Sequence, residues 1–156
     1  MNIRFAVATY ILAYLAHAQG QLVSLEVLVG SASTHPVVVR RLVSALRTAG
    51  LVLTQLGPGG GALLTQQPAS VSLLNVFEAM REPEPDLFAV GSINPNAGCN
   101  LGRVMQHTLE DLFGNAEQAM RHALAAVSLE QVAQQLAARL PSGFSFFSSR
   151  KPRADS

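Results

Sequence analysis

Three arginines stand close together in the chain: Arg40, Arg41 and Arg47. A guanidinium group donates paired hydrogen bonds to phosphate oxygens and to the edges of bases. Thr34 and His35, which precede them, can also bind a phosphate or a base edge. Side chains of these types at this spacing favour a surface that binds a polyanion such as duplex DNA. A charged helix face that is only solvated is the alternative.

The only cysteine, Cys99, is the second candidate for chemistry. A single cysteine excludes an intramolecular disulfide, a zinc ribbon and cysteine-only iron–sulfur ligation within one chain, so we expect no cofactor. Cys99 stands at the start of a long predicted helix, whose N–H groups favour a thiolate, and Arg103 follows four residues later. Cys99 and Arg103 are therefore candidates for a redox sensor. An inert, partly buried cysteine is the alternative.

Metal binding and catalysis are not expected. Cys99 and His107 would lie about 12 Å apart along a straight helix, too far to share one ion. The glycine run at 57–61 lacks the Gly-Lys-Ser/Thr ending of a phosphate-binding loop. No spacing of Ser, His or paired carboxylates requires an enzyme.

Charge is distributed unevenly along the 156 residues, although the net charge is only +1. Up to Phe77 there are four arginines and one glutamate, a net +3, whereas 78–140 holds four arginines and eight acidic residues, a net −4. Only the first half therefore suits a polyanion. With 49% hydrophobic and 13% charged residues, the chain should also cover some apolar surface with a partner.

The first twenty residues resemble a secretory signal peptide, because Arg4 precedes an apolar stretch at 5–16 and the run Ala16-His17-Ala18. The stretch is shorter than the roughly 20 residues that cross a bilayer. Helical spacing of its apolar residues and the following Gly20 instead predict a first helix. We therefore expect a cytoplasmic protein with no membrane partner, and a secreted protein is the distant alternative.

The first half predicts three helices and a hairpin. Ser24 can begin a second helix of about two turns that Gly30 ends, and Pro36 can begin a third that Gly50 ends. The third helix has a predicted buried stripe and an opposite, exposed face. The stripe is Val39, Leu42, Val43 and Leu46, and the exposed face is Val37, Arg40, Arg41, Ser44 and Arg47. Two short β-compatible runs, 51–54 and 62–65, flank the glycines and predict a hairpin, or wing.

The second half predicts mostly helix. Ser72 opens a helix to about Met80, and a long helix follows at 100–127, interrupted in its middle by Gly114-Asn115. The long helix has a seam of residues spaced for packing along a second helix, although a core helix of a monomer is the alternative. The seam comprises Leu101, Met105, Thr108, Leu112, Ala116, Ala119 and Ala123. Ser128 and Gln131 predict a capping box for a last helix to about Arg139.

These elements define a mainly α fold with a small β-hairpin wing. The three short helices and the glycine-tipped hairpin describe a winged helix-turn-helix head, in which the third helix enters the major groove. We expect a DNA-binding domain at 1–80, a linking or sensor loop at 81–99, dimerisation helices at 100–140 and a disordered tail at 141–156.

Three segments resemble the Rrf-type (IscR/NsrR/CymR-like) bacterial transcriptional regulators. They are the run from Pro36 through the "AGLV" at 49–52 and the "GPGGG" at 57–61, followed by Ser72-Leu73-Leu74. The resemblance covers about 1–140. It implies a homodimer with a winged helix-turn-helix at each end and a long helix that crosses between subunits.

DNA-binding candidates come from the arginine pattern and from this resemblance together. They are Arg4, Ser24, Thr34, His35, Pro36, Val37, Arg40, Arg41, Arg47, Gly59 and Gly60. The chain departs from the family in two places. Leu56 and Ala62 stand where many relatives carry an arginine and an aromatic residue, so the wing should contribute less affinity. Cys99 stands alone where cluster-binding relatives hold iron–sulfur with three cysteines, which resembles the cluster-free branch.

The sequence therefore predicts a dimeric, sequence-specific transcriptional regulator, a repressor that is redox-responsive through Cys99. Two heads related by a two-fold axis require a pseudo-palindromic operator. The alternative is a regulator that binds a protein or a small molecule and whose DNA binding is weakened.

Overall fold

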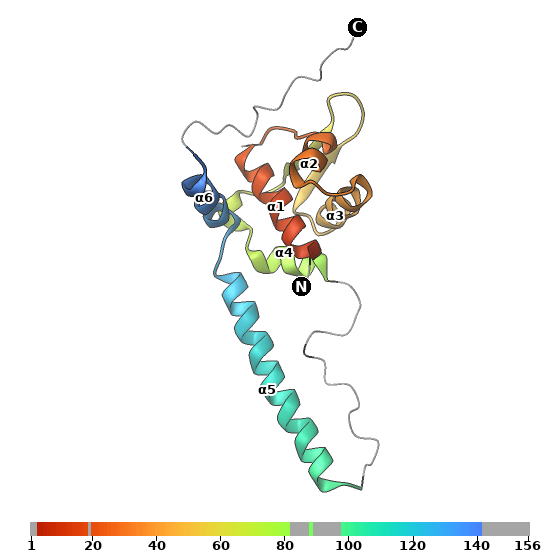
Figure 1. Ribbon diagram of the computed structural model, residues 1–156, viewed down its shortest axis with the longest axis vertical. Coiled ribbons are helices and arrows are strands. Elements are labelled where there is room, and N and C mark those ends of the chain that lie inside the picture. Colours follow the sequence, from red (N-terminus) through yellow and green to blue (C-terminus); the bar gives the residue numbers. More distant parts are fainter. Residues whose placement is uncertain (1–2, 19, 82–87, 89–97, 142–156) are drawn as a thin grey trace.

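The computed structural model describes residues 3–18, 20–81, 88 and 98–141. Figure 1 shows a head that contains α1, α2, α3, α4 and α6, and a single long helix, α5, that leads away from it. Most of the expected linking loop, and the tail from residue 142 onward, lie outside the described residues.

Helix α1 (Ile3–His17) is the central helix of the head. Its side chains Ala8, Ile11, Leu12 and Leu15 are each at most 1% exposed. Gly20 has a φ of +84°, the left-handed conformation that commonly follows a helix. The predicted first helix is therefore confirmed.

Helix α2 (Leu25–Ala32) begins where the sequence predicted, since the Ser24 hydroxyl accepts a hydrogen bond from the Val27 N–H. The predicted end at Gly30 is wrong. The helix continues to Ala32 and stops at Ser33, which has a left-handed φ of +47°. A glycine inside a helix costs only about 1 kcal/mol, which the tertiary packing of Leu28 in the core can offset.

Helix α3 (Pro36–Thr48) has the predicted stripe, because Val39, Leu42, Val43 and Leu46 are all buried. The His35 Nδ1 accepts a hydrogen bond from the Val37 N–H, and Pro36 occupies the first turn. After the helix, Gly50 has a φ of +75°, so the predicted stop is confirmed.

The wing is an antiparallel pair of strands, β1 (Val52–Gln55) and β2 (Gly61–Leu64), with Val52 opposite Leu64 and Gln55 opposite Gly61. Val23 joins it through two backbone hydrogen bonds to Ala62, of 2.9 and 2.8 Å. A Cβ atom on Gly61 would lie 2.3 Å from the Val23 carbonyl oxygen, so only glycine allows this approach. The wing is thus bonded to the segment that leads into α2.

A short 3₁₀ turn, η1 (Pro68–Ser70), connects the wing to α4 (Leu73–Met80). Ser72 and Asn75 form a capping box at the start of α4. The side chains of Val76 and Met80 are buried in the core. The predicted helix over 73–80 is confirmed.

Helix α5 (Asn100–Ala125) continues without a break through Gly114, and none of its residues is buried. Helix α6 (Leu129–Arg139) then returns to the head, capped by Ser128 and Gln131 as predicted. It packs against α1 and places the fully buried Leu129 in the core. The sequence analysis grouped both helices at 100–140 as dimerisation helices. In the structure α6 packs in the head, whereas α5 extends away from it.

Candidate DNA-binding surface

The exposed face of α3 carries the arginine cluster. Val37, Arg40, Arg41, Ser44 and Arg47 are all exposed, on the side of the helix opposite its buried stripe. The buried stripe fixes the rotation of α3 about its own axis, and the head core therefore determines which way these side chains face. The structure places Arg40, Arg41 and Arg47 on one surface, as the spacing predicted.

The residues just before α3 serve its local geometry as well. The His35 Nδ1 is engaged with the Val37 N–H at 3.3 Å, which leaves the Nε2 edge of this exposed ring for another partner. Thr34, half-buried, donates its hydroxyl proton to the Ala32 carbonyl at 2.9 Å, and its oxygen can still accept. Ser24 is half-buried and caps α2.

Arg4 belongs to a different element from the α3 arginines. It lies half-buried in the first turn of α1. Its neighbour Phe5 packs edge-on against Phe77 of α4, with ring centroids 5.8 Å apart. The beginning of α1 is therefore held beside α4.

The glycines of the wing form its tight turn. Gly59 has a φ of +74°. The Gly60 N–H donates to the Gly57 carbonyl at 3.0 Å, and a Cβ on Gly60 would meet the Gln55 carbonyl oxygen at 2.3 Å. Residues 52–65 include no charged side chain, and Leu56 at the tip is 91% exposed. The wing therefore presents backbone and apolar groups, without a charge for phosphate.

Cys99 is exposed and occupies the N-cap position of α5. The Arg103 N–H donates to the Cys99 carbonyl at 3.2 Å, and the Arg103 guanidinium donates to the Asn100 side-chain oxygen. The guanidinium that was expected to act on the thiol thus has a hydrogen-bond partner on its own helix.

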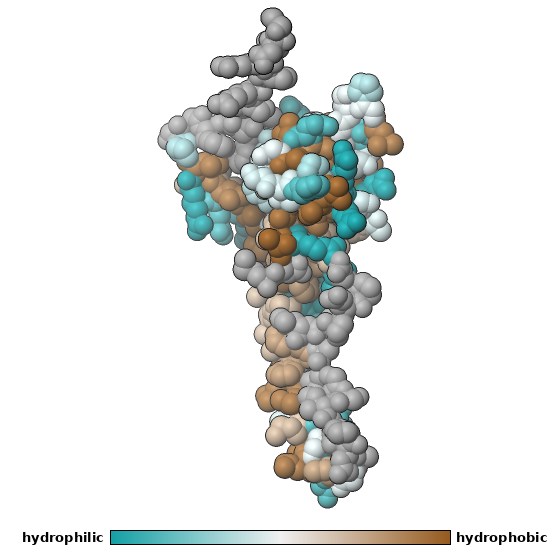
Figure 2. Space-filling view, turned by 45° about the vertical axis from the view of Figure 1, so that its right-hand side comes forward, coloured by the Kyte–Doolittle hydropathy of each residue, from teal (hydrophilic) through white to brown (hydrophobic). Residues whose placement is uncertain are grey.

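One face of α5 is an exposed apolar stripe. Leu101, Met105 and Leu112 of the predicted seam are 72%, 50% and 57% exposed, and Val104 beside them is 63% exposed. The remaining seam residues, Thr108, Ala116, Ala119 and Ala123, are exposed too. Figure 2 shows apolar surface along the part of this helix that faces the viewer. A core-facing position for the seam within one subunit is therefore wrong.

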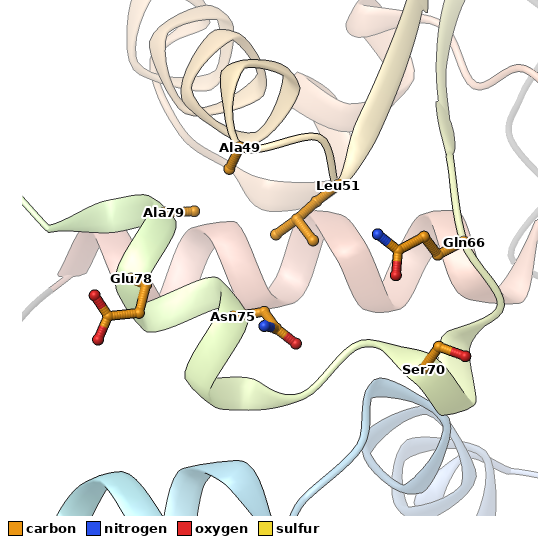
Figure 3. A pocket seen from close by; sticks show the side chains of 7 residues that line it. All are labelled: Ala49, Leu51, Gln66, Ser70, Asn75, Glu78 and Ala79. Carbon is orange, nitrogen blue, oxygen red and sulfur yellow. The ribbon is translucent and has the colours of Figure 1, made fainter.

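A small pocket of about 360 Å³ lies between the end of α3, the 3₁₀ turn and α4. Figure 3 shows Leu51 pointing into it from above, with Gln66 and Asn75 on the other sides. The remaining lining residues are Ala49, Ser70, Glu78 and Ala79. The lining is neutral except for the Glu78 carboxylate.

The joint between the head and α5 was not predicted from the sequence. Glu78 Oε1 of α4 lies 2.6 Å from Arg121 Nη1 of α5. Glu117 lies 3.7 Å from the same nitrogen, and Arg81 lies 3.6 Å from the other oxygen of Glu78. Glu78 and Arg121 are 43 residues apart, and no local pattern in a sequence pairs such distant charges.

Metal ligands do not gather in the part of the chain that the structure describes. No group of three or more His, Cys, Asp or Glu side chains there could hold an ion. His107 instead pairs with Glu110, its Nδ1 lying 3.4 Å from the carboxylate. Within the same residues, every helix is too short or too polar to cross a membrane.

A basic helix exposed after a tight turn, followed by a β-hairpin, defines a winged helix-turn-helix protein. Residues 1–135 match the model of the Rrf2 family, which is described as an iron-dependent transcriptional regulator. YwnA of Bacillus subtilis, which is named "Putative HTH-type transcriptional regulator YwnA", is 38% identical over 136 residues, which are 87% of this chain and 98% of YwnA. This chain therefore belongs to the Rrf2 family of transcriptional regulators.

Solved structures share the fold. A crystal structure titled "Crystal structure of a putative DNA binding protein" is 34% identical, has a TM-score of 0.66 and covers 83% of this chain and 97% of its own. CymR, the global cysteine regulator of B. subtilis, is 20% identical, has a TM-score of 0.65 and covers 86% of this chain and 96% of its own. The mainly α fold with a winged helix-turn-helix and a long helix is thereby confirmed. The regulatory class rests on the family match and on the similarity to YwnA.

An iron–sulfur cluster held by cysteines does not fit the cysteine content of this chain. An iron–sulfur cluster is held by several thiolates, and the sequence supplies one cysteine, at the exposed start of α5. The described residues offer no group of His, Asp or Glu around Cys99 that could replace the missing thiolates.

Proposed function

We propose that this protein is a homodimeric repressor that binds a pseudo-palindromic operator through α3. The observation that carries the proposal is the exposed face of α3, where Arg40, Arg41 and Arg47 stand together opposite a fully buried stripe. An α-helix fits the major groove, where arginine binds guanine and phosphate, and Val37 can contact a thymine methyl group. Pro36, Thr34 and His35 hold the helix start that would approach the bases.

The proposed dimer follows from α5. This helix of 26 residues has an exposed apolar stripe and no buried residue, so nothing within one subunit covers the stripe among the described residues. The same stripe on a second subunit, related by a two-fold axis, would cover it. Two heads related by this axis need inverted half-sites in the DNA. Repression follows where the operator overlaps a promoter, and the proposed location is the cytoplasm, with the DNA.

Selection of bound sequences from random duplex DNA tests this function. The wild-type protein should enrich an inverted repeat, and the double variant Arg40→Ala with Arg41→Ala should lose at least about tenfold in affinity for it. Arg139→Ala, on α6, removes an exposed arginine away from α3 and serves as the matched control. Absence of enrichment, or unchanged regulation by the double variant, would instead support the alternative of a regulator that binds a protein or a small molecule.

We also propose that oxidation of Cys99 weakens operator binding, without an iron–sulfur cluster. The exposed thiol stands at the N-cap of α5, where a modification would alter the start of the proposed dimerisation helix. Cys99→Ser should keep basal DNA binding and lose its response to a mild oxidant such as hydrogen peroxide. The same response in Cys99→Ser would exclude Cys99 from the mechanism.

A further inference from the structure

Besides the packing of α4 against α5, two polar contacts of the described residues join the head to the C-terminal end of α5. At the first, the Leu73 N–H donates to the Val127 carbonyl at 2.9 Å, and the Leu129 N–H donates to the Val71 carbonyl at 2.7 Å. This pair of bonds joins the turn after α5 to the segment that precedes α4. A single point of this kind fixes where α5 begins to leave the head, and leaves its direction free.

The second point is the ion pair between Glu78 and Arg121. It lies six residues before Val127, about 9 Å farther along α5. The Glu78 oxygen that contacts Arg121 has no access to solvent, and the two side chains are only 37% and 33% exposed. Partial burial weakens the screening of this pair by salt. Two points at different heights on a rigid helix determine its direction.

The rest of α5 lies beyond both points. Figure 1 shows the helix leaving the head beside α4 and extending away from it. From Val127 to Asn100 the helix is about 40 Å long. A tilt of about 5° at the joint therefore moves its far end by about 3.5 Å, close to the 3.4 Å rise of one base pair.

Arg121 also lies on the opposite side of α5 from the exposed stripe. Nine residues separate it from Leu112, which is two and a half helical turns. One side of α5 is therefore bound to its own head while the other side is free for a second copy. A partner seated on the stripe moves with α5 whenever the helix tilts.

We propose that the Glu78–Arg121 pair is a specificity device, which sets the half-site spacing of the operator by fixing the direction of α5 relative to the head. This inference rests on the proposed function, since it needs a dimer on DNA. Neither residue touches DNA in this proposal: both are positioning residues. Loss of the pair leaves α3 and its arginines intact, so binding remains, and discrimination among spacings falls.

The experiment measures affinity for the selected operator and for versions with one or two base pairs added or removed between the half-sites. Wild-type protein should prefer one spacing by roughly tenfold or more, as for a mismatched site. Arg121→Gln should reduce this preference to about threefold or less at nearly unchanged affinity for the best spacing. Arg139→Gln, which removes an arginine from α6, should keep the wild-type preference.

Glu78→Gln provides a second test of the same pair if Arg121→Gln folds poorly by circular dichroism. It should broaden the spacing preference equally, and the double variant should be no broader than either single variant. An unchanged preference in both folded variants, additive effects, or a wild-type protein that binds every spacing equally would overturn the inference. Failure of wild-type protein to bind any duplex would instead reject the proposed function.

Discussion

Gly60 shows how one residue shapes the wing. Its Cβ position is occupied by backbone, with the Gln55 carbonyl oxygen at 2.3 Å and the Gly57 carbonyl oxygen at 2.8 Å. Backbone atoms at these distances cannot move away by a change of rotamer, as the end of a flexible side chain can. The tip of the wing therefore admits no side chain at this position without changing the turn.

Gly60→Ala should destabilise the head by about 1–3 kcal/mol, the usual cost of forcing extra atoms into an occupied space. Gly30→Ala is the matched control: no atom lies within 4 Å of its Cβ position inside α2, so it should stabilise by about 0.5–1 kcal/mol. Urea unfolding followed by circular dichroism measures both. Equal free energies of unfolding for Gly60→Ala and wild type would contradict the close approach.

At the level of elements, local signals in the sequence predicted most starts and stops. Ser24, Ser72 and Ser128 each cap the helix that was expected after them, because a cap is a contact between neighbours in the chain. The predicted end of α2 at Gly30 was wrong because a glycine weakens a helix without having to end it. The ion pair of Glu78 with Arg121 and the return of α6 to α1 join distant segments, and no spacing pattern encodes them.

The exposed stripe of α5 gives a prediction at this scale. Leu112→Glu places a charge in the middle of the apolar face and should weaken the proposed dimer at least about tenfold, since the buried charge would lack a partner. Gln118→Glu adds the same charge on another side of the helix and should leave the dimer intact. Sedimentation equilibrium measures both. A monomeric wild-type protein at micromolar concentration would refute the interface.

At the scale of the whole molecule, the basic residues of the first half are gathered in one part of the fold. The arginines of the first half lie in the head, on α1 and α3. Of the acidic residues of the second half, those that the structure describes are divided among α4, α5 and α6. An anionic duplex would therefore be attracted to the part of the head that carries these arginines. This attraction would orient the protein on DNA before any base is contacted.

Salt dependence tests this orientation quantitatively. A dimer offers Arg4, Arg40, Arg41 and Arg47 twice, and if about six of these contact phosphate, the slope of log affinity against log salt should be near −5. Arg47→Ala removes one contact in each subunit and should make the slope shallower by about 1.8, whereas Arg139→Ala should leave it unchanged. Operator binding at several sodium chloride concentrations measures the slope. A wild-type slope near −1 would mean that these arginines do not contact the phosphates, because each phosphate contact releases counterions and adds about −0.9 to the slope.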